Sequence, residues 1–300
     1  MSRQTTKNWS TPTTDDLFKS FAATWRARGF ATSTSKNYLS YVRQFAASID
    51  RNLLDVERTD LEAFVTRVMD RLSVASAAYA ARSVKAFYKW LHEEEAVAEN
   101  PAARLRIPVV PVPSTKVADA DEVQILLASC RDGKLFASFN DRRDAALIHV
   151  LRSAGLRIGE AAAMELRDID QDAGSVLVPK TKTRKPRTVG LDAKAGNSLS
   201  WYFRLIDVTD QGLLWRTSNG RPLTQDGVKQ AFRRRAKRAD VKLTPHQLRR
   251  RFAVDWCRKG GSQASLQALA GWNSSSMPAR YYAGEAGLLA LEEQRRLFAS

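Results

Sequence analysis

Three prolines, Pro108, Pro111 and Pro113, lie close together in the segment RLRIPVVPVPSTK, residues 104–116. Each proline fixes φ and removes a backbone N–H, so this stretch can form neither an α-helix nor a central strand. It predicts an extended, semi-rigid linker over residues 108–116. Because 300 residues are enough for two domains of ordinary size, we expect one domain on each side of this linker.

The residues before the linker have the pattern of a helical bundle. Apolar side chains recur at helical spacing in four stretches that begin near positions 13, 33, 59 and 76. The sequences TTDD (residues 13–16) and TDLE (residues 59–62) match the capping box that opens many helices. We therefore predict an all-α domain over residues 13–107, preceded by a flexible polar arm over residues 1–12.

The residues after the linker also favour helices, with two short strands among them. Residues 175–179 and 187–191 have the apolar, β-branched character of strands, and the segment KTKTRKP between them predicts a turn with four cations. Helical patterns include residues 142–151, 225–239 and 288–298. The expected second domain, residues 117–300, is thus α+β, and the chain as a whole is mostly α.

The chain carries a large excess of positive charge. Its 48 Lys and Arg outnumber its 32 Asp and Glu, which gives a formal net charge of +16. Residues 1–112 contribute +4 and residues 113–300 contribute +12. Such an excess indicates a polyanionic partner, with nucleic acid first and an anionic membrane surface second. The basic helices lack a large apolar face, so we favour nucleic acid clamped between two basic domains.

Several classes of protein are excluded by what the sequence lacks. Cys130 and Cys257 are far apart and the three histidines are scattered, so no zinc-site spacing exists and both thiols are expected to stay reduced. No apolar run approaches the roughly 20 residues that cross a bilayer. The N-terminus has no apolar segment of the kind found in secretion signals, so we predict a cytoplasmic, DNA-associated protein without membrane contact.

The segment with the most chemical character is TPHQLRRRFAVDWCRKGGSQASLQALAGWNSSSMPARYY, residues 244–282. Pro245 suits the first turn of a helix, which would place His246 and Arg249 on one face. Apolar residues at every fourth position of this helix (248, 252 and 256) predict that Arg249 points away from the core. A histidine and guanidinium groups near a helix start, followed by phenols, would suit a phosphodiester.

Each candidate residue also has an ordinary structural interpretation. Arg157 precedes Glu160 by three positions, which fits either a surface ion pair or a guanidinium that forks onto phosphate. A lysine in the predicted hairpin is either solvated or a proton donor. His246 is a packed or capping residue, or a proton relay. Trp272 and Tyr281 are core aromatics, or a phosphate hydrogen-bond donor and a nucleophile.

The predicted helix over residues 225–239 carries a dense basic cluster. It is either a solubilising face or a surface that follows the DNA backbone. Cations this close repel one another without a counter-surface, which favours DNA. The cluster consists of Arg233, Arg234, Arg235, Lys237 and Arg238.

The order of these motifs is more specific than any single one. GLRIGE contains Arg157, a lysine-bearing hairpin follows, PHQLRRRFA contains His246 and Arg249, and Tyr281 stands nine residues after the Trp of Gly-Trp. This layout resembles the tyrosine recombinase (phage integrase) family, including its Xer-like site-specific recombinases. Residues 13–107 are similar to the family's SAM-like core-binding domain and residues 117–300 to its catalytic domain. The last helix resembles the tail that protomers exchange.

The resemblance implies a catalytic set and a function. The function is site-specific DNA strand exchange, in integration and excision or in resolution, through a 3′-phosphotyrosine. Tyr281 would be the nucleophile, with Tyr282 as its nearest rival, and Lys182 would protonate the leaving 5′ oxygen, with Lys180 and Lys185 as weaker candidates. The implied set is Arg157, Lys182, His246, Arg249, Trp272 and Tyr281.

The remaining members of the set have implied roles as well. Arg157 and Arg249 would bind the non-bridging phosphate oxygens, and His246 would assist proton transfer. Trp272 stands where most members have histidine, and would donate a hydrogen bond to phosphate. Further DNA contacts are expected from Lys36, Arg43, Arg184, Lys185, Arg233, Arg234 and Arg250.

The same resemblance implies the partners. No metal, cofactor or ATP is expected, since cationic side chains supply the charge that a metal supplies elsewhere. The substrate would be double-stranded DNA with inverted half-sites, bound by a homotetramer that assembles through the C-terminal helix from free monomers, with or without an accessory protein. Two alternatives stay open: a type IB topoisomerase, and a catalytically inactive sequence-specific DNA-binding protein on the same scaffold.

Overall fold

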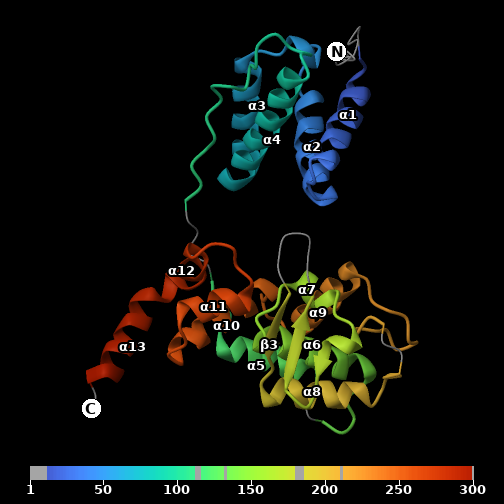
Figure 1. Ribbon diagram of the computed structural model, residues 1–300, viewed down its shortest axis with the longest axis vertical. Helices are drawn as coiled ribbons and strands as arrows, with labels where there is room; N and C mark the ends of the chain where they lie inside the picture. The colour runs from blue at the N-terminus through green and yellow to red at the C-terminus, as the bar shows by residue number, and fades with distance from the viewer. Residues whose placement is uncertain (1–11, 112–115, 132–133, 180–185, 210–211, 299–300) are drawn as a thin grey trace, which may run out of the picture. The chain divides into compact units, whose positions relative to one another are not determined.

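The computed structural model describes residues 12–111, 116–131, 134–179, 186–209 and 212–298 (Figure 1). The chain divides into two compact units, Met1–Val112 and Pro113–Ser300. Of the arm predicted for residues 1–12, only Pro12 belongs to the described part of the chain. None of the described helices is both long enough and apolar enough to cross a membrane.

The first unit is a bundle of helices, as the apolar periodicity predicts. Its core is rich in aromatic rings, and Phe87 packs edge-on against Phe21 with ring centroids 5.4 Å apart. A 3-10 turn, η1 (Leu53–Asp55), connects two of the helices. The helices are α1 (Thr14–Ala27), α2 (Thr32–Ala46), α3 (Arg58–Arg71) and α4 (Val74–Glu93).

The two capping boxes predicted in this unit have different outcomes. The first is confirmed, because Thr13 caps α1 and pairs with Asp16. The second is wrong by two residues: α3 is capped by Glu57, whose backbone N–H donates to Asp60 Oδ2 at 2.9 Å. Asp60 completes this capping box three residues after Glu57. From sequence alone, an Asp at the third position of a helix looks the same as an Asp that is itself the cap.

The second unit combines helices with one small sheet. The antiparallel sheet has the order β1-β2-β3, and Val176 pairs with Val189 at its centre. Its strands are β1 (Ile169–Asp170), β2 (Ser175–Val178) and β3 (Arg187–Gly190), and two 3-10 turns, η2 (Leu166–Asp168) and η3 (Ala283–Glu285), occur beside the helices. The helices are α5 (Ala120–Ser129), α6 (Phe139–Ser153), α7 (Ile158–Ala162), α8 (Ala193–Phe203), α9 (Gln225–Arg238), α10 (Pro245–Arg258), α11 (Gln263–Ala270), α12 (Ser276–Tyr282) and α13 (Ala286–Phe298).

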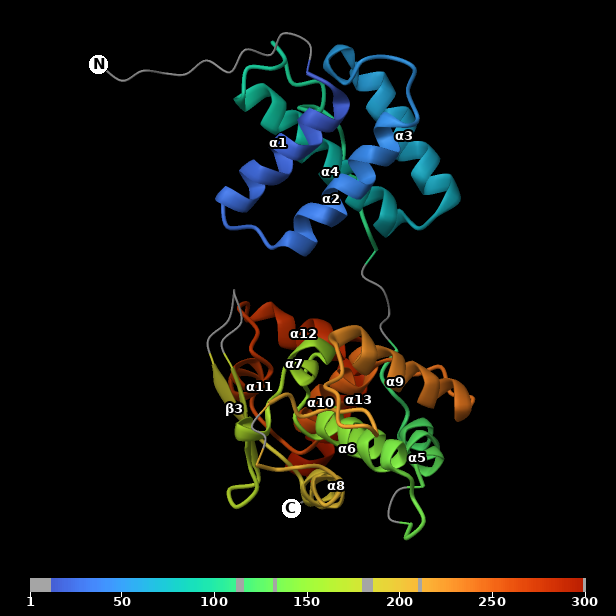
Figure 2. The ribbon, with the colours of Figure 1, turned by 90° about the vertical axis from the view of Figure 1, so that its right-hand side faces the viewer.

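Helix α6 runs through the core of this unit and packs against α8, α9 and α10 (Figure 2). Its residues from Ala145 to Leu151 are buried. It begins three residues before the predicted start because Ser138 caps it together with Asp141. In both views α7 and α12 lie at one end of the unit and α8 lies at the opposite end.

The basic cluster on α9 differs from the prediction at one position. Arg235 is buried, and its guanidinium lies 2.7 Å from Asp141 Oδ1 and 2.9 Å from Asp144 Oδ2. These two carboxylates supply the counter-charge for Arg235, so DNA is not needed to balance this member of the cluster. The other four cations of the cluster are exposed: Arg233, Arg234, Lys237 and Arg238.

Candidate active site

The two arginines predicted to bind phosphate meet at the end of α11. Arg249 Nη1 donates to the Gly155 carbonyl at 2.6 Å, and its Nη2 donates to the Ala270 carbonyl at 2.6 Å. Arg157, the N-cap of α7, also donates to the Ala270 carbonyl, at 3.4 Å. Since residue 270 ends α11, both guanidiniums bind a carbonyl that the helix leaves unpaired.

Arg249 is not turned away from the core as predicted; its exposed fraction is 0%. The cause is the close packing of α10 on the turn before α7. Gly155 has φ +58°, and a Cβ there would lie 2.3 Å from the Phe252 ring. Only glycine admits this approach, and one helical turn before Phe252 the Arg249 side chain passes inward to reach the turn's carbonyl.

A buried carboxylate, Glu160, links the arginines. Its side chain is 4% exposed, and it lies 3.0 Å from Arg157 Nη1, 2.9 Å from Arg187 Nη2 and 3.8 Å from Arg249 Nη1. Burial by itself raises the pKa of Glu160, but hydrogen bonds from Arg187 and from the Arg157 backbone N–H, with the charges of both, lower that pKa to about 2. Glu160 is therefore ionised at every ordinary pH.

Positive charge exceeds negative charge at this place. Among the described residues, the guanidiniums of Arg157, Arg187 and Arg249 are opposed by one carboxylate, Glu160, and by the partial negative charge at the end of α11. Buried cations such as Arg187 and Arg249 are stable only when they are paired or when an anion joins them. The excess suits an oxyanion such as a phosphate group. Within the described ranges, no group of three or more His, Cys, Asp and Glu side chains lies together as a metal ion would require.

Aromatic rings cover the Arg249 guanidinium. Trp272 and Tyr281 are 5% and 8% exposed, and their ring centroids are 4.4 Å apart. The guanidinium carbon of Arg249 lies 5.3 Å from the Trp272 ring and 5.7 Å from the Tyr281 ring. Among the described residues, neither Arg249 Nε nor Trp272 Nε1 has a hydrogen-bond partner, although both atoms are buried. Two such donors are what an incoming anion would satisfy.

His246 stands beside the predicted nucleophile. Pro245 opens α10, as predicted, and Thr244 caps the helix. The exposed His246 ring lies 5.3 Å from the Tyr281 ring. Partial desolvation, followed by the charges of Arg250, Arg249 and Arg157, lowers the pKa of His246. The imidazole is therefore neutral at neutral pH and able to accept a proton.

The other predicted residues fall into three groups. Lys180, Lys182, Arg184 and Lys185 lie outside the described residues. Arg250 is half-buried and donates to the Lys116 carbonyl at 3.4 Å, while Lys36 and Arg43 are exposed on α2 of the first unit. Arg233 and Arg234 are exposed on α9, and Tyr282 is the last residue of α12.

Two site residues were missed in the sequence, Glu160 and Arg187. The motif GLRIGE contains Glu160, but an i,i+3 pair looks the same in sequence whether it is exposed or buried. Arg187 opens β3 and was counted only as a strand residue. The available signal for Arg187 was a charged residue at the start of a strand that packs on the core.

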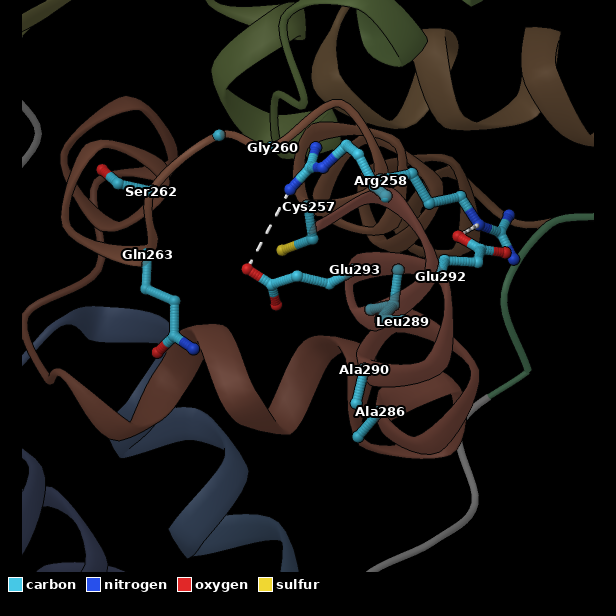
Figure 3. Close-up of a pocket in the computed structure, with 12 residues that line it drawn as sticks. Cys257, Arg258, Gly260, Ser262, Gln263, Ala286, Leu289, Ala290, Glu292 and Glu293 are labelled. Carbon is cyan, nitrogen blue, oxygen red and sulfur yellow. Dashed lines mark ion pairs between the residues drawn. The ribbon is translucent and has the colours of Figure 1, made fainter. Parts of the chain in front are cut away.

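A cavity of about 410 Å³ lies elsewhere in this unit (Figure 3). It lies between α13 and the turn that connects α10 to α11. Arg258 forms an ion pair with Glu285 of η3 at 3.2 Å and another with Glu292 of α13 at 3.3 Å. Its lining includes Cys257 and Leu289 and none of the predicted catalytic residues.

Comparisons with known proteins agree with this architecture. The family model described as "Phage integrase family" matches residues 116–286. The model described as "Phage integrase, N-terminal SAM-like domain" matches residues 17–97. The tyrosine recombinase XerD of Ralstonia nicotianae is 30% identical over 274 residues, which cover 87% of each chain. The tyrosine recombinase XerC of Leptospira interrogans is 27% identical over 244 residues, which cover 79% of this chain and 78% of the relative.

Solved structures share the fold at lower identity. A lambda integrase dimer bound to a COC′ core site aligns with a TM-score of 0.71 and 19% identity, covering 90% of this chain and 77% of that one. A Tn1549 transposon integrase in complex with transposon right end DNA aligns with a TM-score of 0.69 and 19% identity, covering 95% and 99%. Family models match both units, and a XerD relative is 30% identical over 87% of each chain. The chain therefore belongs to the phage integrase family of tyrosine recombinases.

Proposed function

We propose that this protein is a site-specific recombinase that cuts and rejoins double-stranded DNA through a 3′-phosphotyrosine formed on Tyr281. One observation carries the proposal. The Tyr281 ring lies over Arg249, and Arg249 and Arg157 bind one carbonyl, that of Ala270. A nucleophile and two guanidiniums suited to phosphate oxygens therefore lie within one cluster that has an excess of positive charge.

The proposed chemistry assigns one task to each group. The phenol oxygen of Tyr281 forms a bond to phosphorus as the bond to the 5′ oxygen breaks, and the phenol proton passes to neutral His246. Negative charge that builds up on the non-bridging oxygens is stabilised by Arg157 and Arg249. In the second step a 5′-hydroxyl attacks the phosphotyrosine, so the phosphodiester is restored and the phenol is released.

Two further groups complete the proposed reaction. Trp272 donates from Nε1, the buried atom without a partner among the described residues, to a phosphate oxygen. Lys182 protonates the leaving 5′ oxygen, a role carried over from the family. Every charge that the reaction needs is then supplied by side chains, so we propose that no metal, cofactor or ATP takes part.

Assembly on DNA is proposed to involve the last helix. None of the described residues of α13 is buried, and Leu288, Leu291 and Leu297 are 56%, 40% and 64% exposed. Exposed apolar side chains on this last helix suit a contact with a second protomer. Lambda integrase has been solved as a tetramer bound to a Holliday junction, with a TM-score of 0.72 to this chain at 19% identity, and with 91% of this chain and 78% of that one covered. We propose the same stoichiometry here, on inverted half-sites.

The test is covalent trapping. Wild-type protein, Tyr281→Phe and Tyr282→Phe are incubated, without added metal, with nicked duplexes taken from the flanks of the protein's own gene and with a pool of duplexes randomised around the nick. We expect a protein–DNA adduct on a denaturing gel that only Tyr281→Phe abolishes. Loss of the adduct in Tyr282→Phe alone would assign the nucleophile to the next residue, and no adduct from any duplex would overturn the proposal. Relaxation of any supercoiled plasmid by the wild type would favour a topoisomerase.

A further inference from the structure

We infer that Arg187, the first residue of β3, is a positioning residue of this site: it holds Glu160 and the end of α11 where Arg157 and Arg249 need them. The inference rests on the proposed function, which assigns those two arginines to the phosphate. It adds a residue that neither touches the substrate nor belongs to the predicted set.

Arg187 uses all three nitrogens of its guanidinium in the fold. Nη2 donates to Glu160 Oε2 at 2.9 Å and Nη1 to Glu160 Oε1 at 3.3 Å, which is the two-pronged geometry of an arginine–carboxylate pair. Nε donates to the Leu269 carbonyl at 2.7 Å. The side chain is only 10% exposed, so Arg187 acts on the phosphate through other residues.

The two hydrogen-bond acceptors of Arg187, Glu160 and the Leu269 carbonyl, lie where the phosphate-binding arginines are held. Glu160 also accepts the backbone N–H of Arg157 at 2.9 Å and its Nη1 at 3.0 Å. The carbonyl next to that of Leu269 belongs to Ala270, which binds Arg249 and Arg157. Loss of the Arg187 side chain therefore removes one support from the carboxylate and one from the helix end, the two groups that locate Arg157 and Arg249.

The end of α11 closes directly on Arg187. Gly271 caps the helix with φ +61°, and a Cβ at this position would lie 2.9 Å from Arg187 Nη1. Trp272 follows at once, and its ring faces the Arg249 guanidinium at 5.3 Å. Arg187 thus connects β3 to the turn that delivers Trp272 to the site. A lysine could reach Glu160 or the Leu269 carbonyl but could not span both with a planar fork.

The experiment compares Arg187 with a matched buried arginine, Arg143, in the same unit. Arg143 donates from Nη2 at 2.7 Å and from Nε at 3.0 Å to one oxygen of Asp144, Oδ1. It also donates to the Arg216 carbonyl at 3.0 Å, and its side chain is 5% exposed. The variants are Arg187→Gln, Arg187→Lys, Arg143→Gln and Arg143→Lys. For each we measure the melting temperature, the affinity for a duplex trapped by the wild type, and the rate of adduct formation at saturating protein, well below the melting temperature.

For Arg187→Gln we expect unchanged DNA affinity and a rate lower by roughly tenfold to a hundredfold, because catalytic groups displaced by about 1 Å lose rate on that scale. Arg187→Lys should recover part of the loss. The loss of stability between pH 4.5 and 2 should be smaller in Arg187→Gln than in the wild type, since Arg187 is the strongest of the groups that lower the pKa of Glu160. Both Arg143 variants should lose stability yet keep the wild-type rate and pH profile.

A wild-type rate in Arg187→Gln would overturn the inference, as would equal losses of rate in the Arg143 variants, which would reduce the effect to stability. A loss of DNA affinity with an unchanged rate would also overturn it, because Arg187 would then be a direct DNA contact. These results differ from failure of the proposed function itself, in which the wild type forms no adduct at all.

Discussion

The Tyr281 ring lies 5.7 Å from the guanidinium carbon of Arg249, and together with Trp272 it covers a side chain that has no exposed surface. A phosphate oxygen therefore has no path to Arg249 while the phenol stays in place. The two roles proposed for these residues are compatible only if Tyr281 moves as DNA enters. The charge of Arg249 is meanwhile stabilised by the carbonyls of Gly155 and Ala270.

Replacement of Arg249 should affect stability as well as catalysis. We expect Arg249→Ala to lower the free energy of unfolding by about 3–5 kcal/mol, because the buried carbonyls of Gly155 and Ala270 each lose a hydrogen bond of 2.6 Å and a fully buried side chain is removed. Arg250→Ala is the matched control, since the next side chain is half-buried with one long hydrogen bond of 3.4 Å, and it should cost less than about 1 kcal/mol. Urea denaturation measures both, and equal losses would contradict the burial of Arg249.

Gly155 should be far less replaceable than another glycine of similar backbone conformation. Gly155 and Gly174 have φ of +58° and +57°, so alanine at either position adopts the left-handed conformation at a cost of about 1 kcal/mol. Only at Gly155 does the new Cβ meet a ring, that of Phe252 at 2.3 Å. Gly155→Ala should therefore cost a further 1–3 kcal/mol, approximately. Melting temperatures compare the two, and similar values would show that α10 withdraws freely from the turn.

Glu160 should give the protein a specific loss of stability in acid. Its folded-state pKa of about 2 lies below the ordinary value of 4.5, so its contribution is complete above pH 4.5 and is lost as the pH falls toward 2. At about 1.4 kcal/mol per pKa unit, the loss amounts to about 3 kcal/mol. Glu160→Gln should remove this part of the pH dependence, whereas Glu62→Gln, an exposed pair with Arg58, should retain it. Denaturation at a series of pH values gives the slopes.

The pKa of His246 should rise when a neighbouring cation is removed. Arg250→Ala removes the charge that lowers the pKa of His246 most. Arg251 pairs with Asp255 at 2.8 Å and does not contribute to that lowering. NMR titration can follow His246 because the chain has only three histidines, and His246→Asn assigns its signal. We expect an upward shift in Arg250→Ala and no shift in Arg251→Ala. The reverse pattern would place Arg250 too far from the imidazole to act on it.

Neighbouring arginines on α9 should behave in opposite ways. Arg234 is exposed, so Arg234→Ala should leave stability unchanged and reduce the salt dependence of DNA binding by about one unit of slope. Arg235 is paired with Asp141 and Asp144 inside the core, so Arg235→Ala should destabilise the fold by about 3–5 kcal/mol. Salt titrations of DNA binding and urea denaturation separate the two effects. An unchanged salt slope in Arg234→Ala would remove that residue from the proposed DNA surface.

Local patterns predicted the elements better than the direction of individual side chains. The start of α10 at Pro245 is where the sequence places it, because a helix start depends on a few consecutive residues. The burial of Arg249 and Arg235 was not predictable in this way. Each satisfies its charge with partners about 90 residues away in the chain, such as the Gly155 carbonyl for Arg249 and Asp144 for Arg235, and no helical period contains that information.

The sequence by itself determined the mostly helical fold and the order of motifs that identifies the family, since periodicity, caps and motif spacing are properties of neighbouring residues. Only the tertiary structure decided how the charges of the site are held. Glu160, Arg187 and the end of α11 come together because a left-handed glycine lets α10 approach the turn before α7 and another lets α11 end on Arg187. Contacts of this kind depend on the distance between elements, which the chain sets only when it is packed.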